Sequence, residues 1–192
     1  MTLGANTVFS HNTLIRDCWK PTRKKIYYCK IRFGIMGEHI HNVLEDTHYI
    51  VRNDRPIVIT GTIGEQWVIS VEVLKRKYRT AEGNLITDSF LRDLMRSKSS
   101  VKIKSVPEKG NNYTNYALGL DIRKYRDIPI ITSWGDTLLA NRSGTNHSRG
   151  DFLVCGMLSN GQPDFNDMWV VNGQVFSETY DIRGFGGVLY KA

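Results

Sequence analysis

The chain has 192 residues, of which 41% are hydrophobic, and a formal net charge of +7. This apolar content is enough to bury the core of one ordinary domain or of two small domains packed together, which argues against a disordered chain. No apolar run reaches the roughly 18 residues of a membrane-spanning helix, and the first residues lack the regions of a secretory signal, so we expect a soluble intracellular protein with no membrane partner.

Residues 1–80 divide into an N-terminal arm (1–21) and a first module (22–80). Within the module, apolar or alternating runs separated by glycine-containing turns predict strands, the first of them ending at Gly37. The module closes with apolar residues at the spacing of a helix. Ser70 precedes them and can cap a first helical turn.

Residues 81–125 differ in character and are expected to connect two modules. Thr87 or Asp88 can cap an amphipathic helix near residues 87–97, whose apolar stripe contains Phe90, Leu91 and Leu94. The segment SVKIKSV then alternates like a strand. We expect this connector to pack across both modules.

Residues 126–192 form the second module. The runs IPIITSWG and DFLVCG predict strands, SNGQPDFND has the composition of a loop, and a short helix follows Asn172. Each module would be only marginally stable alone, so we expect mutual packing with pseudo-twofold symmetry.

An internal duplication is the clearest pattern in the chain. QWVISVEVLKRKYR aligns with MWVVNGQVFSETYD at a constant offset, which matches Trp67 with Trp169 and Tyr78 with Tyr180. Upstream, HYIV is aligned with DFLV, and MGEHIH with WGDTLL. Because the tryptophans and tyrosines occur in both copies, we expect them to be core residues rather than stacking platforms.

The same motifs carry a resemblance to a known family. SWGD, RGDFLV, MWVV and VFSETY of the second module, and GEQWVIS and VLKRKY of the first, resemble the PGDYG-type proteins of bacteria and phages. The first module has EDTHYIV where that pattern has Gly-Asp. The resemblance implies a small β-rich fold and a location in the cytoplasm of a bacterium or an infected host cell. It implies no reaction and no catalytic residues.

Positive charge is concentrated in residues 1–125, whereas residues 126–192 carry a slight excess of acidic residues. Basic runs that share a face attract phosphates. The expected phosphate contacts are all in or beside the first module: Lys24, Lys25, Lys30, Arg32, Lys75, Arg76 and Lys77. Tyr27 and Tyr28 alternate with these charges and are the candidate stacking residues. The alternative is a solvated surface without a dedicated partner.

His39 and His41, with His48 nearby, form the one cluster whose residue types suit a metal. On a strand the first two would share a face, but the spacing identifies no third ligand, so we expect ordinary histidines, no metal and no cofactor. Cys29 and Cys155 lie in apolar strand patterns, where a buried inert thiol is the common outcome.

Asp151 and Asp136 could form a paired-carboxylate site, but Gly150-Asp151 more simply predicts a turn leading into a strand. We therefore assign no catalytic residue.

The predicted fold is α+β and β-dominated, with two related modules and a bridging helix. The predicted function is a non-catalytic binding protein that engages nucleic acid or a nucleotide through its basic first half. Two alternatives stay open: a structural or protein-interaction role, with a protein partner or a homo-oligomer, and an enzyme acting on a nucleotide-like substrate.

Overall fold

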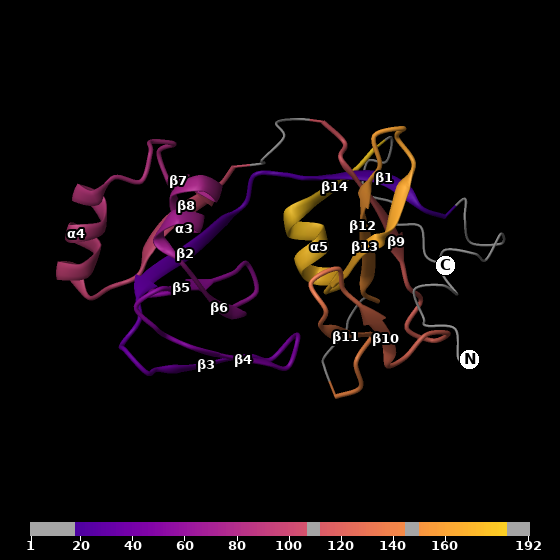
Figure 1. Ribbon diagram of the computed structural model, residues 1–192, viewed down its shortest axis with the longest axis horizontal. Helices are drawn as coiled ribbons and strands as arrows, with labels where there is room; N and C mark the ends of the chain where they lie inside the picture. The colour runs from indigo at the N-terminus through magenta and orange to yellow at the C-terminus, as the bar shows by residue number, and fades with distance from the viewer. Residues whose placement is uncertain (1–17, 107–111, 145–149, 184–192) are drawn as a thin grey trace. The chain divides into compact units, whose positions relative to one another are not determined.

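The computed structural model describes residues 18–106, 112–144 and 150–183 (Figure 1). The chain divides into two compact units. Lys25–Gly110 form one, which we call the continuous unit. Met1–Lys24 together with Asn111–Ala192 form the other, which we call the split unit. Each contains one five-stranded antiparallel sheet and one separate two-stranded hairpin.

The sheet of the continuous unit has the strand order β6-β5-β2-β8-β7. Its strands are β2 (Tyr28–Phe33), β5 (Ile57–Thr60), β6 (Gln66–Ile69), β7 (Tyr78–Thr80) and β8 (Val101–Ser105). β2 is central because it pairs with β5 on one side and β8 on the other. Alternation along β2, where Cys29 and Ile31 are buried and Tyr28 and Lys30 are exposed, gives the sheet one apolar and one polar face.

Two helices cover the apolar face. They are α3 (Val71–Lys77), capped by the Ser70 side chain, and α4 (Asp88–Ser97), capped by Thr87. Leu74 of α3 and Leu94 of α4 pack with Ile31 in the main core of this unit. Burial of each such side chain stabilises the fold by about 1.5–3 kcal/mol.

The opposite face is covered at one end only. The hairpin of β3 (His39–Asn42) and β4 (Thr47–Ile50) packs through Ile40 against Val58 and Val68. Figure 1 shows β5 and β6 between helix α3 and this hairpin. The other end of the face carries charged and polar side chains.

The sheet of the split unit has the strand order β13-β12-β9-β1-β14. Its strands are β1 (Lys20–Lys24), β9 (Asn115–Gly119), β12 (Phe152–Met157), β13 (Pro163–Val171) and β14 (Tyr180–Ile182). The N-terminal strand β1 is inserted between β9 and β14, so its two partners come from much later in the sequence.

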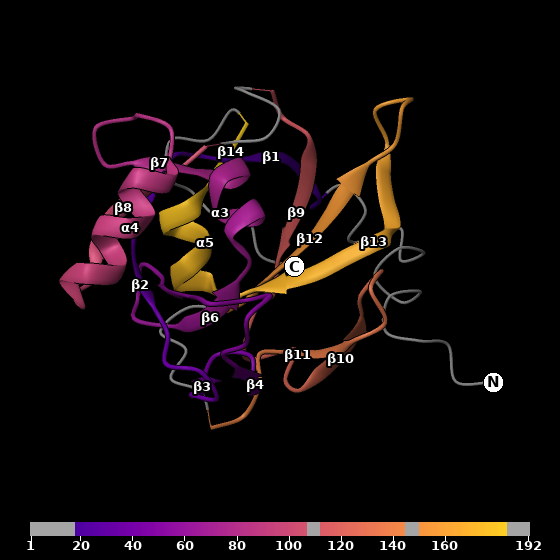
Figure 2. The ribbon, with the colours of Figure 1, turned by 60° about the vertical axis from the view of Figure 1, so that its left-hand side comes forward.

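Both faces of this second sheet are covered. Helix α5 (Gly173–Thr179) packs on one face, where Phe176 stacks on Phe152 with ring centroids 3.9 Å apart. The hairpin of β10 (Ile128–Ile131) and β11 (Thr137–Ala140) packs on the other, through Ile130 and Ala140. Figure 2 shows the sheet with α5 and this hairpin beside it.

The predicted β-dominated fold class is confirmed, but the predicted boundaries differ from the structure. The segment predicted to bridge the modules, 81–125, supplies α4 and β8 to the continuous unit and β9 (Asn115–Gly119) to the split unit, so it is part of both cores rather than a separate connector. Residues 20–24 of the predicted arm and first module form β1 of the split unit, and residues 163–167 of the predicted loop belong to β13. Among the described residues, no helix is long and apolar enough to cross a membrane.

Candidate nucleic-acid interface

The uncovered end of the polar face of the continuous unit carries a cluster of basic and aromatic side chains. β2 and β8 are antiparallel with Tyr28 opposite Lys104 and Lys30 opposite Lys102. Residues directly opposite in such a pair project to the same side of the sheet. These four side chains, which we call the basic face, therefore lie on the side away from α3 and α4.

The contacts within the basic face concentrate positive charge around one ring. The Lys102 Nζ lies 4.4 Å from the centroid of the Tyr28 ring, a cation–π arrangement. Lys30 and Lys102 are exposed and, among the described residues, neither forms an ion pair with a carboxylate. Like charges directly opposite each other destabilise a sheet, so folding alone does not favour this pairing.

Arg32 continues the same side of β2 but is already engaged. Its guanidinium forms a bidentate pair with Glu38, with Nη1 2.9 Å from Oε2. The hydrogen bond from Arg32 lowers the pKa of Glu38, so the pair is charged on both sides at neutral pH. Arg32 therefore contributes less net positive potential than the lysines of the basic face.

The two candidate stacking tyrosines point in different directions. Tyr28 is 46% exposed on the basic face. Tyr27 packs against the helix-covered core, and its hydroxyl lies 3.3 Å from that of Tyr78. Only Tyr28 of the two is placed to offer a ring face to a ligand on the basic face.

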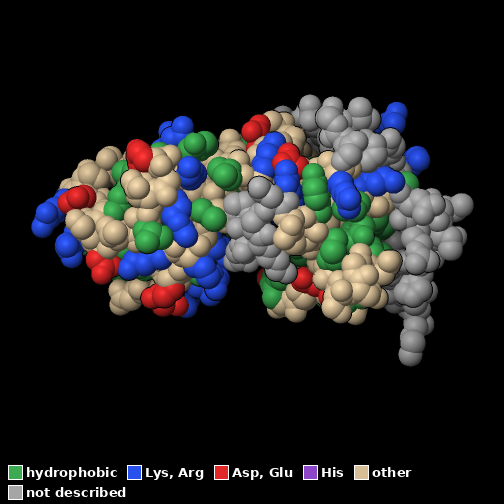
Figure 3. Space-filling model, turned by 90° about the horizontal axis from the view of Figure 1, so that it is seen from above, with side chains coloured by type: hydrophobic (Ala, Val, Ile, Leu, Met, Phe, Trp, Pro, Cys, Tyr) green, Lys and Arg blue, Asp and Glu red, His purple; other side chains and the backbone are tan. Residues whose placement is uncertain are grey.

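The expected phosphate contacts are likewise divided. Lys75, Arg76 and Lys77 belong to α3, on the opposite face of the sheet from Lys30, and the Lys75 Nζ is 2.6 Å from Asp88 Oδ1. In the view of Figure 3, lysine and arginine side chains are spread over the surface of the continuous unit rather than gathered in one patch. The predicted set therefore does not form a single cluster.

Lys24 and Lys25 lie at the boundary of the two units. Lys24 is in β1 of the split unit, where its Nζ lies 5.8 Å from the centroid of the Tyr180 ring. Lys25 is the first residue of the continuous unit and precedes β2. Neither is on the strand rows that form the basic face.

The corresponding positions of the two sheets differ in charge. The rows Trp67–Ile59–Ile31 and Trp169–Val154–Ala117 align the two sheets strand by strand. One residue along from these rows, Lys30 and Lys102 of the continuous unit correspond to Tyr116 and Pro21 of the split unit.

Two residues further along the strands, the aligned positions of the two sheets again differ in charge. Lys104 and Arg79 in the continuous unit correspond to Arg23 and Asp181 in the split unit. Arg23 and Asp181 form an ion pair of 3.6 Å in the split unit. Lys104 and Arg79 are both cations, and Glu82 in the loop after β7 partly balances the charge of Lys104.

Lys102 and Lys104 belong to the basic run MRSKSSVKIK, but they are not among the phosphate contacts predicted from the sequence. They lie in the alternating segment SVKIKSV, whose prediction as a strand is confirmed. The alternation shows that both lysines share a face, but only the register of β8 with β2 shows that Lys30 and Tyr28 share it too.

The carboxylates considered for catalysis have local structural contacts. Asp151 is buried, and its Oδ2 accepts a hydrogen bond of 2.8 Å from the Asn141 backbone N–H. Its own backbone N–H donates to Asn141 Oδ1. Asp136 is exposed in the turn of the β10–β11 hairpin and accepts from Trp134 Nε1. As predicted, Asp151 precedes a strand and its carboxylate accepts from a backbone N–H, but that N–H belongs to Asn141, ten residues away, rather than to a neighbour in a turn.

The two cysteines of the strand patterns are buried, as predicted. Burial raises the pKa of Cys29 and of Cys155 to about 12. Both thiols are therefore protonated at neutral pH, and neither is poised as a nucleophile.

No protein-family model, no curated protein and no solved structure matches this chain. The resemblance to PGDYG-type proteins therefore stays a prediction, and the basic face is interpreted from its own geometry.

Proposed function

We propose that the continuous unit binds a phosphate-bearing ligand, single-stranded nucleic acid in the first place, on its basic face. The observation that carries this proposal is the register of β2 and β8, which groups Tyr28 with Lys30, Lys102 and Lys104 on one open side of the sheet. Proteins that bind single strands combine aromatic platforms with positive charge along the backbone path.

The chemistry of the basic face fits a strand better than a lone phosphate. Tyr28 can offer a π face to one base, and the Lys102 Nζ, which lies over that ring in the free protein, would move aside to meet the phosphate of the stacked nucleotide. Lys30 and Lys104 flank these residues along the two strands. In the proposed complex an extended ligand runs along β2 and β8, past these lysines.

The test is the affinity for a fluorescently labelled twelve-nucleotide single strand, measured by anisotropy at several salt concentrations. Each lost phosphate contact lowers the slope of log affinity against log salt by about 0.7. Lys30→Gln/Lys102→Gln should therefore lower the slope by about 1.4. Tyr28→Ala should cost about 1–3 kcal/mol, the usual contribution of one stacked base.

The matched control is Arg76→Gln/Arg92→Gln, which removes the same charge from the two helices on the opposite face of the sheet. We expect its salt slope to stay within about 0.3 of the unmodified protein, because these residues make no phosphate contact in the proposed complex. If both double variants lost the same affinity and salt slope, oligonucleotide binding would depend on net charge alone and not on the basic face. Tight binding of a mononucleotide with none of the oligonucleotide would assign a nucleotide ligand instead.

A protein-interaction role is the second candidate, and the β10–β11 hairpin favours it. Ile131 and Leu139 are 55% and 41% exposed, and Trp134 in the turn is 57% exposed. Exposed apolar side chains gathered on one hairpin are typical of contact surfaces. A gel-filtration shift on Ile131→Ser/Leu139→Ser would support self-association through this hairpin, and an unchanged elution volume would count against it.

We also propose that the two units are copies of one duplicated module. The support is the shared order of elements and the constant spacing of four pairs: Trp67 and Trp169, Ser70 and Asn172, Leu74 and Phe176, Tyr78 and Tyr180. The upstream matches, HYIV with DFLV and MGEHIH with WGDTLL, do not agree with this shared order of elements. They pair β3 with β11 and β4 with β12, whereas strand order along the chain pairs β3 with β10 and β5 with β12.

A further inference from the structure

The β3–β4 hairpin brings together two histidines that are seven residues apart in sequence. His41 and His48 are directly opposite each other in the ladder. Their imidazole rings are stacked, with centroids 4.2 Å apart and planes at 4°. Ile40 on the neighbouring position faces the sheet, so the two histidines project from the outer side of the hairpin.

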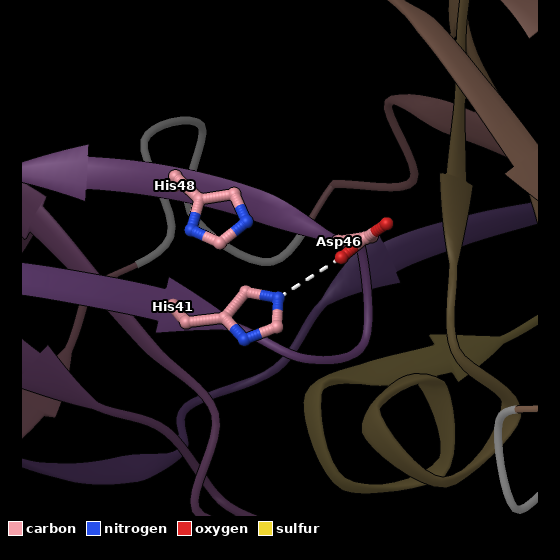
Figure 4. A group of neighbouring side chains, drawn as sticks. All are labelled: His41, Asp46 and His48. Carbon is pink, nitrogen blue, oxygen red and sulfur yellow. Dashed lines mark hydrogen bonds and ion pairs between the residues drawn. The ribbon is translucent and has the colours of Figure 1, made fainter.

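The loop of the same hairpin adds a carboxylate to this pair. Asp46 has a φ of +51° at the end of the loop, and its Oδ1 lies 2.9 Å from His41 Nε2. Figure 4 shows one nitrogen of each imidazole on the side of Asp46. One ligand atom from each of the three residues lies within 4.8 Å of the others.

We propose that His41, Asp46 and His48 form a binding site for a first-row divalent transition metal, with Zn²⁺ as the representative ion. Two imidazoles and one carboxylate are a ligand set that suits zinc and its neighbours, and they do not suit Mg²⁺ or Ca²⁺, which prefer oxygen. Tetrahedral zinc at about 2.1 Å from each ligand atom places those atoms about 3.4 Å apart. The observed spacing brackets this value.

Binding requires a small change in the side chains and none in the backbone. Nitrogen lone pairs lie in the plane of each imidazole, so two stacked parallel rings must tilt toward each other to reach one ion. The ligands are partly exposed, at 45% of the His41 side chain and 55% of Asp46, which leaves room for rotation. Three protein ligands leave a coordination position for water or for a ligand oxygen, as in open zinc sites.

The site is independent of the proposed nucleic-acid binding, and its test uses zinc alone. Calorimetric titration of the full chain, prepared without a histidine tag, should show one Zn²⁺ bound per molecule. His48→Gln and Asp46→Asn should each weaken this binding at least tenfold. NMR signals of the His41 and His48 ring protons should shift on zinc addition because the rings leave the stack.

His39→Gln is the matched control, since His39 is on the same strand and side of the hairpin but outside the three-residue group. It should bind zinc within about twofold of the unmodified protein. Cobalt absorption bands provide a second measurement on every variant. The proposal is overturned if the unmodified protein binds no zinc, if His48→Gln binds as tightly as the unmodified protein, or if His39→Gln loses as much as His48→Gln. Unchanged binding by Asp46→Asn would contradict the three-ligand site.

Discussion

Substitution of Gly150 by alanine should destabilise the split unit strongly. A Cβ atom at this position would lie 1.7 Å from the carbonyl oxygen of Leu120, so the backbone must move apart. Three hydrogen bonds depend on this approach: Leu120 N–H to Asp151 O, and the two bonds between Asp151 and Asn141. At about 1 kcal/mol for each bond, the expected loss is about 3 kcal/mol.

Urea unfolding and hydrogen exchange of the amides in β9 and β12 measure this effect, since exchange assigns the loss to the split unit. Gly161→Ala is the control, because Gly161 has a φ of +81° but no heavy atom lies within 4 Å of the position that a Cβ would take. It should cost only about 1 kcal/mol, the ordinary strain of alanine in a left-handed conformation. A Gly150→Ala loss no greater than that of Gly161→Ala would refute the close-approach reasoning.

Three further predictions concern the continuous unit. Leu74→Ala should lower the free energy of unfolding of the continuous unit by about 2–5 kcal/mol, because Leu74 is fully buried. A loss below about 1 kcal/mol in urea unfolding would contradict this prediction. Burial raises the pKa of Cys29 from 9.0 to about 12, so stability should fall as pH rises from about 9 toward 12, by at most about 1.4 kcal/mol per pH unit. Between pH 8 and pH 10.5, the free energy of unfolding measured in urea should fall less for Cys29→Ala than for the unmodified protein. An equal fall would show that Cys29 is not the cause of the pH dependence. Glu38→Gln should release Arg32 for a phosphate contact and raise the salt slope of oligonucleotide binding by about 0.7, whereas a lower slope would exclude Arg32 from the interface.

Local patterns in the sequence were sufficient to predict several elements. Ser70 and Thr87 cap α3 and α4 as predicted, because capping depends on a few neighbouring residues. Tyr78 and Tyr180 are both 5% exposed, which confirms their predicted place in the core. Trp67 and Trp169, predicted to be core residues as well, are partly buried and pack against the core clusters. The predicted strand SVKIKSV corresponds to β8.

Long-range pairing could not be predicted in the same way. β1 pairs with β14 across nearly the whole chain, and no local signal identifies a partner at that distance. The upstream repeat matches disagree with the order of the strands for a related reason. Short apolar strands such as HYIV and DFLV resemble one another whatever their place in the sheet.

In the candidate sites, too, local sequence patterns predict some of the residues and strand pairing is needed to identify the others. Alternation predicts that Tyr28 and Lys30 share a face, but register is needed to add Lys102 and Lys104. The basic run LKRKYR led to the prediction of phosphate contacts on α3, although charged residues on a helix surface are commonly only solvated. His41 meets His48 and Asp46 through the hairpin register, whereas sequence spacing had favoured His39 as its neighbour.

The central claim is that the basic face of the continuous unit holds a phosphate-bearing ligand. Titration of the ¹⁵N-labelled protein with the twelve-nucleotide single strand, followed by amide chemical shifts, tests it most directly. We expect the largest shifts at Tyr28, Lys30, Lys102 and Lys104, with α3 and α4 little affected. Shifts centred on Lys75, Arg76 and Lys77 of α3, or none in the continuous unit, would contradict the claim.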